Sequence, residues 1–128
     1  MADDVSTRRV LIVDDEPNIV MSLEFLMRKS GFETSVARDG DAALAEVERF
    51  RPDLLLLDAM MPHRDGFEVC QQLRAAGWGD LKIIMLTAKG RETEIAKGLA
   101  VGADAYVTKP FSTRDLVDRV TALLAGGG

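Results

Sequence analysis

The sequence contains no long hydrophobic run, and this excludes a membrane-spanning helix. Among its 128 residues, the longest runs of large aliphatic residues, methionine included, are four residues long: Val10–Val13, Leu54–Leu57 and Ile83–Leu86. A helix needs about 20 apolar residues to cross a bilayer. The N-terminus carries Asp3 and Asp4 where a secretory signal would carry basic residues. We therefore expect a cytoplasmic protein without membrane association.

Cysteine and positive charge are also scarce. The single cysteine, Cys70, cannot form an internal disulfide, which suits a reducing compartment. Lys and Arg number 16 against 21 Asp and Glu, a net charge of −5, and no basic run could neutralise several phosphates. Direct nucleic-acid binding is therefore not expected. The net negative charge raises the question of where in the fold the excess Asp and Glu residues lie.

The composition and length of the chain are those of one globular domain. Hydrophobic residues make up 47% of the chain and charged residues 29%, which excludes disordered and collagen-like classes. A chain of this length can bury roughly two-thirds of its unfolded surface. No internal repeat or second domain is visible in the sequence.

Short apolar runs alternate with segments of helical period, and this pattern predicts an α/β fold with a parallel sheet. Strands are predicted at 10–13, 32–37, 54–57, 82–86 and 105–107. The first is apolar on both faces, as in strands covered by helices on both sides, whereas the second alternates like an edge strand. Five helical segments are predicted after the strands: from Pro17 to Gly31, from the Asp39–Asp41 cap to Pro52, from Gly66 to Gly77, at about 92–101, and from the Ser112 cap to the glycines at 126–128.

A charged or polar residue follows each central apolar run. Asp14 and Asp15 follow the first run, Asp58 the third and Thr87 the fourth, while Lys109 lies just past the fifth. Open parallel sheets bind ligands beyond the carboxyl ends of their strands, so we expect these side chains to converge on one cleft. Taken singly, each is better explained as a solvated loop residue than as a ligand, because strand ends meet water.

Together, these residues have the chemistry of phosphoryl transfer. Three carboxylates at one edge repel one another unless a cation joins them, and oxygen ligands of this kind suit Mg²⁺. Lys109 offers a compact positive charge and Thr87 a hydroxyl for phosphoryl oxygens. A carboxylate nucleophile, a metal, a lysine and a hydroxyl are the parts of a phosphoryl-transfer site. Asp58, at the end of four leucines, is the expected nucleophile.

The set of motifs resembles the receiver domain of bacterial two-component response regulators, and in extent the single-domain chemotaxis regulator. The matching motifs are Val13-Asp14-Asp15-Glu16, Leu57-Asp58-Ala59-Met60-Met61-Pro62, Asp65-Gly66, Thr87-Ala88 and Lys109-Pro110-Phe111. The resemblance implies a flavodoxin-like, doubly wound (βα)5 sandwich with a five-stranded parallel sheet of order 2-1-3-4-5. It covers residues 8–125, with a tail at 1–7 and a glycine tail or linker start at 126–128.

The resemblance also implies roles in metal binding and phosphorylation. Asp58 would accept a phosphoryl group from a phosphohistidine on a sensor histidine kinase or phosphotransfer protein. Asp15 and Asp58 would ligate Mg²⁺ by their carboxylates and Met60 by its backbone carbonyl, with Asp14 acting through a bound water. Self-catalysed phosphorylation and dephosphorylation would be the only chemistry, so an enzyme is not expected.

The implied switch involves the remaining site residues. Lys109 would pair with one phosphoryl oxygen, and Thr87 would hydrogen-bond another. Phosphorylation adds roughly 1.5 to 2 negative charges, which would draw Thr87 inward and let Tyr106 turn into the vacated space. The surface of the fourth helix, fifth strand and fifth helix would then change for an unknown output domain or target protein. A monomer and a phosphorylation-dependent dimer are both compatible. The Lys109–Pro110 peptide would be cis.

Other function classes fit these residues less well. A haloacid-dehalogenase-like aspartyl-phosphate enzyme needs an acid two residues after the nucleophile, where this chain has Met60. A flavodoxin-like nucleotide-binding module needs a glycine-rich turn, whereas the turn Asp14-Asp15-Glu16-Pro17 has no glycine and its acids would repel a phosphate. A receiver that acts only as a non-phosphorylated scaffold would not need the full set of site residues. A single-domain regulator and the receiver part of a longer regulator both stay open.

Overall fold

A five-stranded parallel sheet forms the centre of the computed structural model, which describes residues 8–61, 64–88, 96–97 and 99–126. The strands are β1 (Arg9–Val13), β2 (Glu33–Ala37), β3 (Leu54–Asp58), β4 (Lys82–Ala88) and β5 (Ala105–Lys109). Their order in the sheet is β2-β1-β3-β4-β5, and each neighbouring pair is parallel. The flavodoxin-like topology expected from the resemblance is confirmed.

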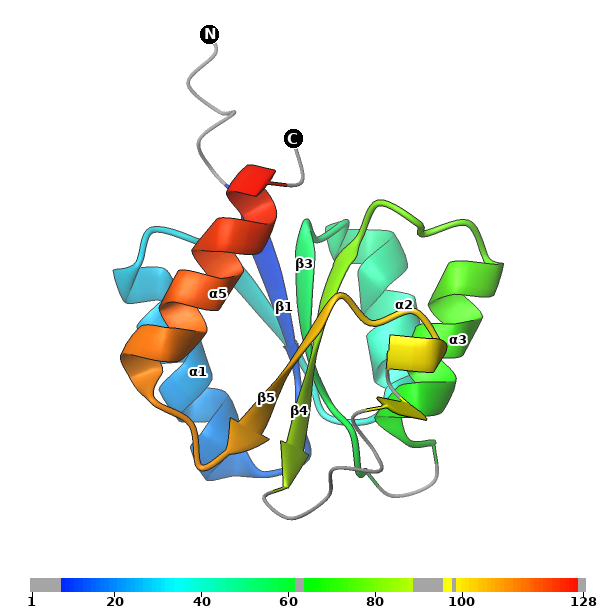
Figure 1. The fold of residues 1–128 in the computed structure, drawn as a ribbon, viewed down its shortest axis with the longest axis horizontal. Coiled ribbons are helices and arrows are strands. Elements are labelled where there is room, and N and C mark those ends of the chain that lie inside the picture. The colour runs from blue at the N-terminus through cyan, green and yellow to red at the C-terminus, as the bar shows by residue number, and fades with distance from the viewer. Residues whose placement is uncertain (1–7, 62–63, 89–95, 98, 127–128) are drawn as a thin grey trace, which may run out of the picture.

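Helices cover both faces of the sheet. They are α1 (Pro17–Lys29), α2 (Gly40–Phe50), α3 (Gly66–Ala75) and α5 (Thr113–Gly126). Helices α1 and α5 lie on one face, and α2 and α3 on the other (Figure 1). Half of the helix predicted at about 92–101 lies outside the described residues, and within the described half residues 96–97 and 99–100 are helical. No helix in the described part of the chain is long and apolar enough to span a bilayer.

The helices start where the sequence supplies groups for their free amides. Pro17 occupies the first turn of α1, where its missing N–H would have no partner in any case. The Asp39 carboxylate accepts a hydrogen bond from the Ala42 N–H (2.7 Å) at the start of α2. The Asp65 carboxylate accepts from the Glu68 N–H (2.9 Å) at the start of α3. These helices therefore begin close to the carboxyl ends of the strands before them.

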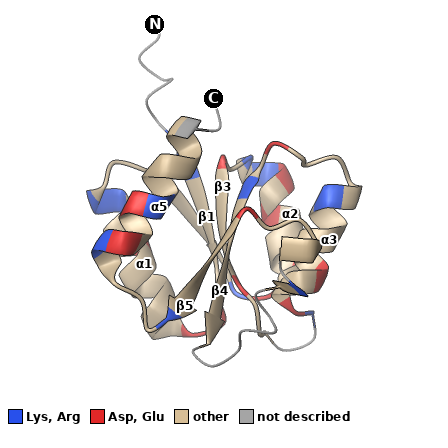
Figure 2. Cartoon of the chain, viewed as in Figure 1, with Lys and Arg blue, Asp and Glu red and all other residues tan. Residues whose placement is uncertain are grey.

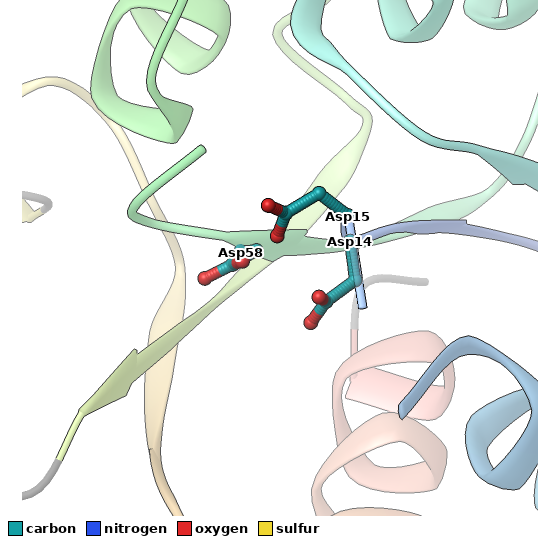
Figure 3. A group of neighbouring side chains, drawn as sticks. All are labelled: Asp14, Asp15 and Asp58. Carbon is teal, nitrogen blue, oxygen red and sulfur yellow. The ribbon is translucent and has the colours of Figure 1, made fainter. Parts of the chain in front are cut away.

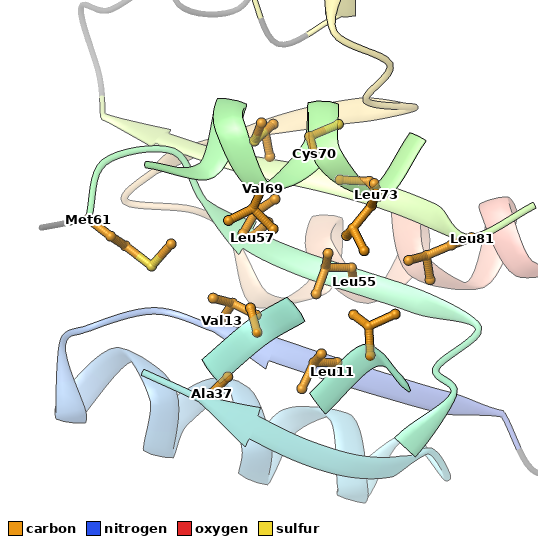
Figure 4. Packing of buried hydrophobic residues seen from close by; sticks show 14 of the residues in the cluster. Leu11, Val13, Ala37, Leu55, Leu57, Met61, Val69, Cys70, Leu73 and Leu81 are labelled. Atoms are coloured by element: carbon orange, nitrogen blue, oxygen red, sulfur yellow. The ribbon is translucent and has the colours of Figure 1, made fainter. Parts of the chain in front are cut away.

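Two hydrophobic layers hold the sheet rigid. Alternate strand residues, among them Leu11, Leu55 and Leu57, pack under α2 and α3 with Val69 and Leu73 (Figure 4). The intervening strand residues, among them Ile12, Leu54 and Leu56, pack under α1 and α5 with Leu23 and Leu116. All five residues of β3 are buried, as predicted for a central strand. The strand that ends in Asp58 is thus fixed by packing on both faces.

Strands β4 and β5 each end two residues beyond the apolar runs that predict them, and β3 ends one residue beyond its run. Strand β4 continues to Ala88 and β5 to Lys109, so Thr87 and Lys109 lie within strands and not beyond them. The reason is backbone pairing: Thr87 lies opposite Thr108 and Ala88 opposite Lys109. Ladder hydrogen bonds join main-chain groups and do not require apolar side chains. Strand β2 lies at the sheet edge as predicted, and begins at Glu33.

Charged residues of both signs occur along the helices (Figure 2). Several form exposed ion pairs, such as Arg28 with Glu24 (2.9 Å) and Arg64 with Glu68 (2.9 Å). Pairs of this kind contribute at most about 1 kcal/mol each. The acidic residues that can form a functional site are therefore those at the carboxyl ends of the strands.

Candidate functional site

Three carboxylates meet where β1 and β3 end. Asp14 and Asp15 follow β1, and Asp58 is the last residue of β3. Oxygen atoms of the three side chains lie within 4.8 Å of one another (Figure 3). The register of the two strands, with Val13 opposite Leu57, brings the following residues side by side. The structure therefore brings together the three aspartates that the sequence placed at one sheet edge.

Lys109 joins this cluster from the far end of the chain. Its Nζ lies 2.9 Å from Oδ2 of Asp14, a residue 95 positions away, and 3.5 Å from Oδ1 of Asp58. Strand β5 carries Lys109 to the same edge because every strand of the sheet runs in the same direction. One ammonium group thus contacts two of the three carboxylates directly.

Asp14 is the fully buried member of the cluster, with an exposed fraction of 0%. Its Oδ1 accepts a hydrogen bond from the Glu16 N–H (3.0 Å), and its Oδ2 accepts one from Lys109. A buried carboxylate is tolerated only when it is paired and hydrogen-bonded in this way. The direct pairing of Asp14 with Lys109 is a feature that the sequence did not reveal.

The Asp58 carboxyl has a pKa well above its ordinary value. Burial raises its pKa, the charge of Asp14 raises it further, and the opposing effects of Lys109 and the Met60 N–H leave it at about 7. The side chain is 9% exposed. A carboxylate of this kind ionises readily at neutral pH when a cation offsets the neighbouring negative charge.

Lys109 keeps its positive charge despite partial burial. Burial alone would lower the pKa of its ammonium group. The hydrogen bond to Asp14 and the charges of Asp58, Asp14 and Glu16 outweigh that effect, so the pKa is raised. The site therefore contains a permanent cation for an incoming anion.

Thr87 supplies a buried hydroxyl beside the cluster. Its exposed fraction is 2%, and within the described residues its Oγ1 has no hydrogen-bond partner. Asp58 lies opposite Leu86 in the sheet, so Thr87 is the next residue along β4. A buried polar group without a partner costs about 1 to 3 kcal/mol. Such an orphaned donor at a sheet edge suits a ligand oxygen.

The chain after β3 packs against the backbone of Asp58. The Met60 N–H donates to Oδ1 of Asp58 (3.2 Å), while the Met60 side chain is 48% exposed. A Cβ on Gly66 would lie 2.3 Å from the Asp58 carbonyl oxygen, and the Gly66 N–H donates to the Ala59 carbonyl (2.9 Å). Glycine is therefore required at the start of α3. This close approach to the Asp58 backbone explains the glycine of the Asp65-Gly66 motif and could not be read from the motif itself.

Glu16 is a fourth acid near the cluster, and it is not among the residues to which the resemblance gives a role. Its Oε1 lies 3.8 Å from the Lys109 Nζ, and its side chain is 64% exposed. Its position directly after the Asp14-Asp15 pair was the one available signal. Proximity to Lys109 depends on how α1 begins and is not visible in the sequence.

Comparison with known families agrees with this geometry. A family model described as the response regulator receiver domain matches residues 10–121. The chain belongs to the response regulator receiver family. It is a receiver domain of two-component signal transduction. Membership decides against the haloacid-dehalogenase-like and nucleotide-binding alternatives.

Relatives of this receiver domain include longer proteins. The sensory transduction protein RegX3 of Mycobacterium tuberculosis is 50% identical over 119 residues, which are 93% of this chain and 52% of that protein. The chain therefore spans about half the length of the curated relatives it matches.

Solved structures of receivers superimpose closely. A putative response regulator from Chloroflexus aurantiacus has a TM-score of 0.87 at 36% identity, covering 93% of this chain and 98% of that one. The receiver domain of the Francisella response regulator 1452 has a TM-score of 0.88 at 32% identity, covering 94% and 99%.

Two further features of the receiver lie next to the site. The Lys109–Pro110 peptide is cis, as the resemblance implied. Tyr106, on β5, is partly buried against the hydrophobic layer under α2 and α3. Arg119 of α5 donates a hydrogen bond to the Tyr106 carbonyl (3.4 Å). The proposed switch residue is thus linked to both a core layer and a helix.

Proposed function

We propose that this receiver domain accepts a phosphoryl group on Asp58 from a phosphohistidine of a histidine kinase or phosphotransfer protein. One observation carries the proposal: the buried Asp58 carboxylate lies among two other carboxylates, 3.5 Å from the Lys109 ammonium. A nucleophile, a cation and an acidic cluster at one sheet edge are what transfer to an aspartate requires.

Receiver domains bind Mg²⁺ in an acidic pocket, and the donor set here fits that ion. The oxygen atoms of Asp14, Asp15 and Asp58 lie within 4.8 Å of one another, and hard oxygen donors suit Mg²⁺. The carboxylates of Asp15 and Asp58 and the backbone carbonyl of Met60 would hold it directly, with Asp14 acting through water. When bound, the ion supplies positive charge that offsets the carboxylates and the phosphoryl oxygens.

The transfer itself uses groups of this chain. An Asp58 carboxylate oxygen forms a bond to phosphorus while the phosphorus–nitrogen bond of the phosphohistidine breaks, and the imidazole leaves with the electron pair. Lys109 pairs with one phosphoryl oxygen, and the orphaned Thr87 hydroxyl donates to another. This chemistry is self-catalysed and modifies the protein itself, so we assign no turnover of another substrate.

The output is a change of surface. The phosphoryl group adds roughly 1.5 to 2 negative charges at the sheet edge. Thr87 moves toward them and Tyr106 turns inward, which reshapes the surface formed by residues 96–97 and 99–100, β5 and α5. The candidate contacts for an output domain or separate target are Lys97, Tyr106, Arg114 and Arg119. Identical amide spectra of this surface with and without phosphorylation would exclude the switch.

Intact mass spectrometry tests the proposal. Wild-type protein incubated with Mg²⁺ and a small acyl phosphate should gain the mass of one phosphoryl group, and an Asp58→Ala variant should gain none. A wild-type protein that gains no mass, or a variant that gains as much, would contradict phosphorylation at Asp58. The same pair with a phosphorylated histidine kinase tests the protein donor.

A further inference from the structure

Glu16 occupies the solvent side of the cluster. Among the residues that the structure describes, three carboxylates lie within 4.0 Å of the Lys109 Nζ: Asp14 at 2.9 Å, Asp58 at 3.5 Å and Glu16 at 3.8 Å. The side chains of Asp14 and Asp58 are buried, whereas that of Glu16 is 64% exposed. An anion that approaches Lys109 from solvent therefore meets the charge of Glu16.

The position of Glu16 is set by its backbone. Its N–H donates to Oδ1 of Asp14 (3.0 Å), and its carbonyl accepts from the Val20 N–H (3.0 Å), so the residue is tied to the site at one end and to α1 at the other. A carboxylate at a helix start commonly caps the free amides. Here the Glu16 side chain makes no such cap hydrogen bond with α1. Its charge is therefore free to act on Lys109 and on the space beside it.

We propose that Glu16 selects among phosphoryl donors by repelling small anionic donors in proportion to their charge. The inference rests on Asp58 as the phosphoacceptor and adds a determinant of donor specificity. Glu16 does not touch the reacting atoms, and it acts through its charge on Lys109 and on the incoming anion.

Coulomb's law gives the size of the effect. A phosphoryl oxygen paired with Lys109 would lie within about 7 Å of Glu16, since one separation is 3.8 Å and the other about 2.9 Å. In water, a unit charge at that distance slows the approach of a donor about threefold for each negative charge that the donor carries. Salt at about 1 M reduces the Debye length to about 3 Å and should remove most of the effect.

A protein donor escapes this discrimination. A phosphohistidine on a folded partner arrives with contacts from the partner's own surface, and these offset a local repulsion. A free acyl phosphate has no such contacts. Glu16 therefore favours transfer from a protein donor over uncontrolled phosphorylation by small metabolites that carry a phosphoryl group.

Two small donors of different charge provide the test. Acetyl phosphate at neutral pH carries one more negative charge than phosphoramidate. In both reactions the Asp58 carboxylate forms the new bond to phosphorus. The phosphorus–oxygen bond of acetyl phosphate breaks and acetate leaves, while the phosphorus–nitrogen bond of phosphoramidate breaks and ammonia leaves. The rates are followed by intact mass at saturating Mg²⁺ and at low ionic strength.

The variants are Glu16→Gln and, as a matched control, Glu48→Gln. Glu48 is an exposed acid on α2, outside the cluster. We expect Glu16→Gln to increase the rate of phosphorylation by acetyl phosphate about threefold more than the rate with phosphoramidate, because the donors differ by one charge. The difference should disappear in high salt, and Glu48→Gln should match wild type. The unfolding midpoints of all three proteins serve as a check on folding.

Binding of inorganic phosphate gives a second readout that needs no phosphorylation. Amide resonances of Thr87 and Lys109 should report tighter phosphate binding in Glu16→Gln than in wild type, and the gain should fall with added salt. Equal rates and equal phosphate affinities in the two proteins would overturn the role of Glu16, as would a gain that salt does not reduce. No mass gain on wild type would instead overturn phosphorylation of Asp58 and, with it, this inference.

Discussion

Replacing Asp58 by Asn should stabilise the metal-free protein at alkaline pH. The wild-type carboxyl has a pKa of about 7, raised from the ordinary 3.8 by burial and by the charge of Asp14. Between these two values the folded protein keeps a proton that the unfolded chain releases. Stability therefore falls as pH rises from about 4 to about 7 and levels off above that range.

The magnitude follows from the pKa. A rise from 3.8 to about 7 corresponds to about 4 kcal/mol when the folded carboxyl is fully ionised. Solvent that reaches the cleft past the exposed Asp15 screens part of this, so we expect a gain of about 2 to 4 kcal/mol for Asp58→Asn at about pH 8. At about pH 4 the gain should be below about 1 kcal/mol, because the folded carboxyl is then protonated and the unfolded one, with its ordinary pKa of 3.8, is only partly ionised.

Urea unfolding in EDTA measures the difference. Fluorescence of the single tryptophan, Trp78, is a suitable signal because the side chain is partly buried against the core and lies outside the acidic cluster. For a protein of this size, a gain of 2 to 4 kcal/mol should move the midpoint by about 1 to 2 M urea. Asp118→Asn, a change at an exposed acid of α5, is the control and should stay within about 0.5 kcal/mol of wild type at both pH values.

Two outcomes would refute the reasoning. If Asp58→Asn were no more stable than wild type at alkaline pH, burial and the charge of Asp14 would not destabilise the ionised Asp58 carboxylate in the folded protein. If the gain were the same at acidic and alkaline pH, it would come from packing or hydrogen bonding and not from charge.

Three further changes probe neighbouring features. Mg²⁺ affinity, measured by calorimetry, should fall about tenfold per pH unit below about 7, because a proton competes for Asp58; an affinity independent of pH would contradict this. Thr87→Val should raise the free energy of unfolding by about 1 kcal/mol, since it removes a buried hydroxyl without a partner, and a destabilised variant would show that the hydroxyl is satisfied. Gly66→Ala should destabilise the fold by about 2 to 3 kcal/mol because its Cβ would lie 2.3 Å from the Asp58 carbonyl oxygen. Gly79→Ala, where a Cβ meets nothing within 4 Å, should be nearly neutral, and equal effects at the two glycines would count against the close contact.

The strand pattern was predictable because hydrophobic burial determines it. Runs such as Leu54–Leu57 are apolar on both faces only where helices cover both sides of the sheet. The central strands could therefore be predicted from the sequence. The ends of β4 and β5 were not, because main-chain pairing carries both strands past their apolar residues to Ala88 and Lys109. Burial patterns identify where a strand is packed, while ladder hydrogen bonds decide where it stops.

Convergence of the site was predictable, but its internal pairing was not. Parallel strands end at one edge, which was enough to bring Asp14, Asp58 and Lys109 together from distant parts of the chain. Which carboxylate the ammonium contacts most closely depends on side-chain geometry within a few ångströms. The 2.9 Å contact to Asp14 and the 3.8 Å approach of Glu16 therefore emerged only from the structure.

The pairing of Asp14 with Lys109 decides how variants of the site should be interpreted. Asp14 is fully buried, so removal of Lys109 would leave an uncompensated charge at a cost of about 3 to 5 kcal/mol. A Lys109→Ala protein that fails to take up phosphate could therefore have lost its fold and not a phosphoryl contact. Replacing Asp14 together with Lys109 removes both charges and separates the two effects. The ammonium that stabilises the resting cluster is the same group that the phosphoryl oxygen would use, so the stability of the resting cluster and its readiness to accept phosphate depend on one side chain.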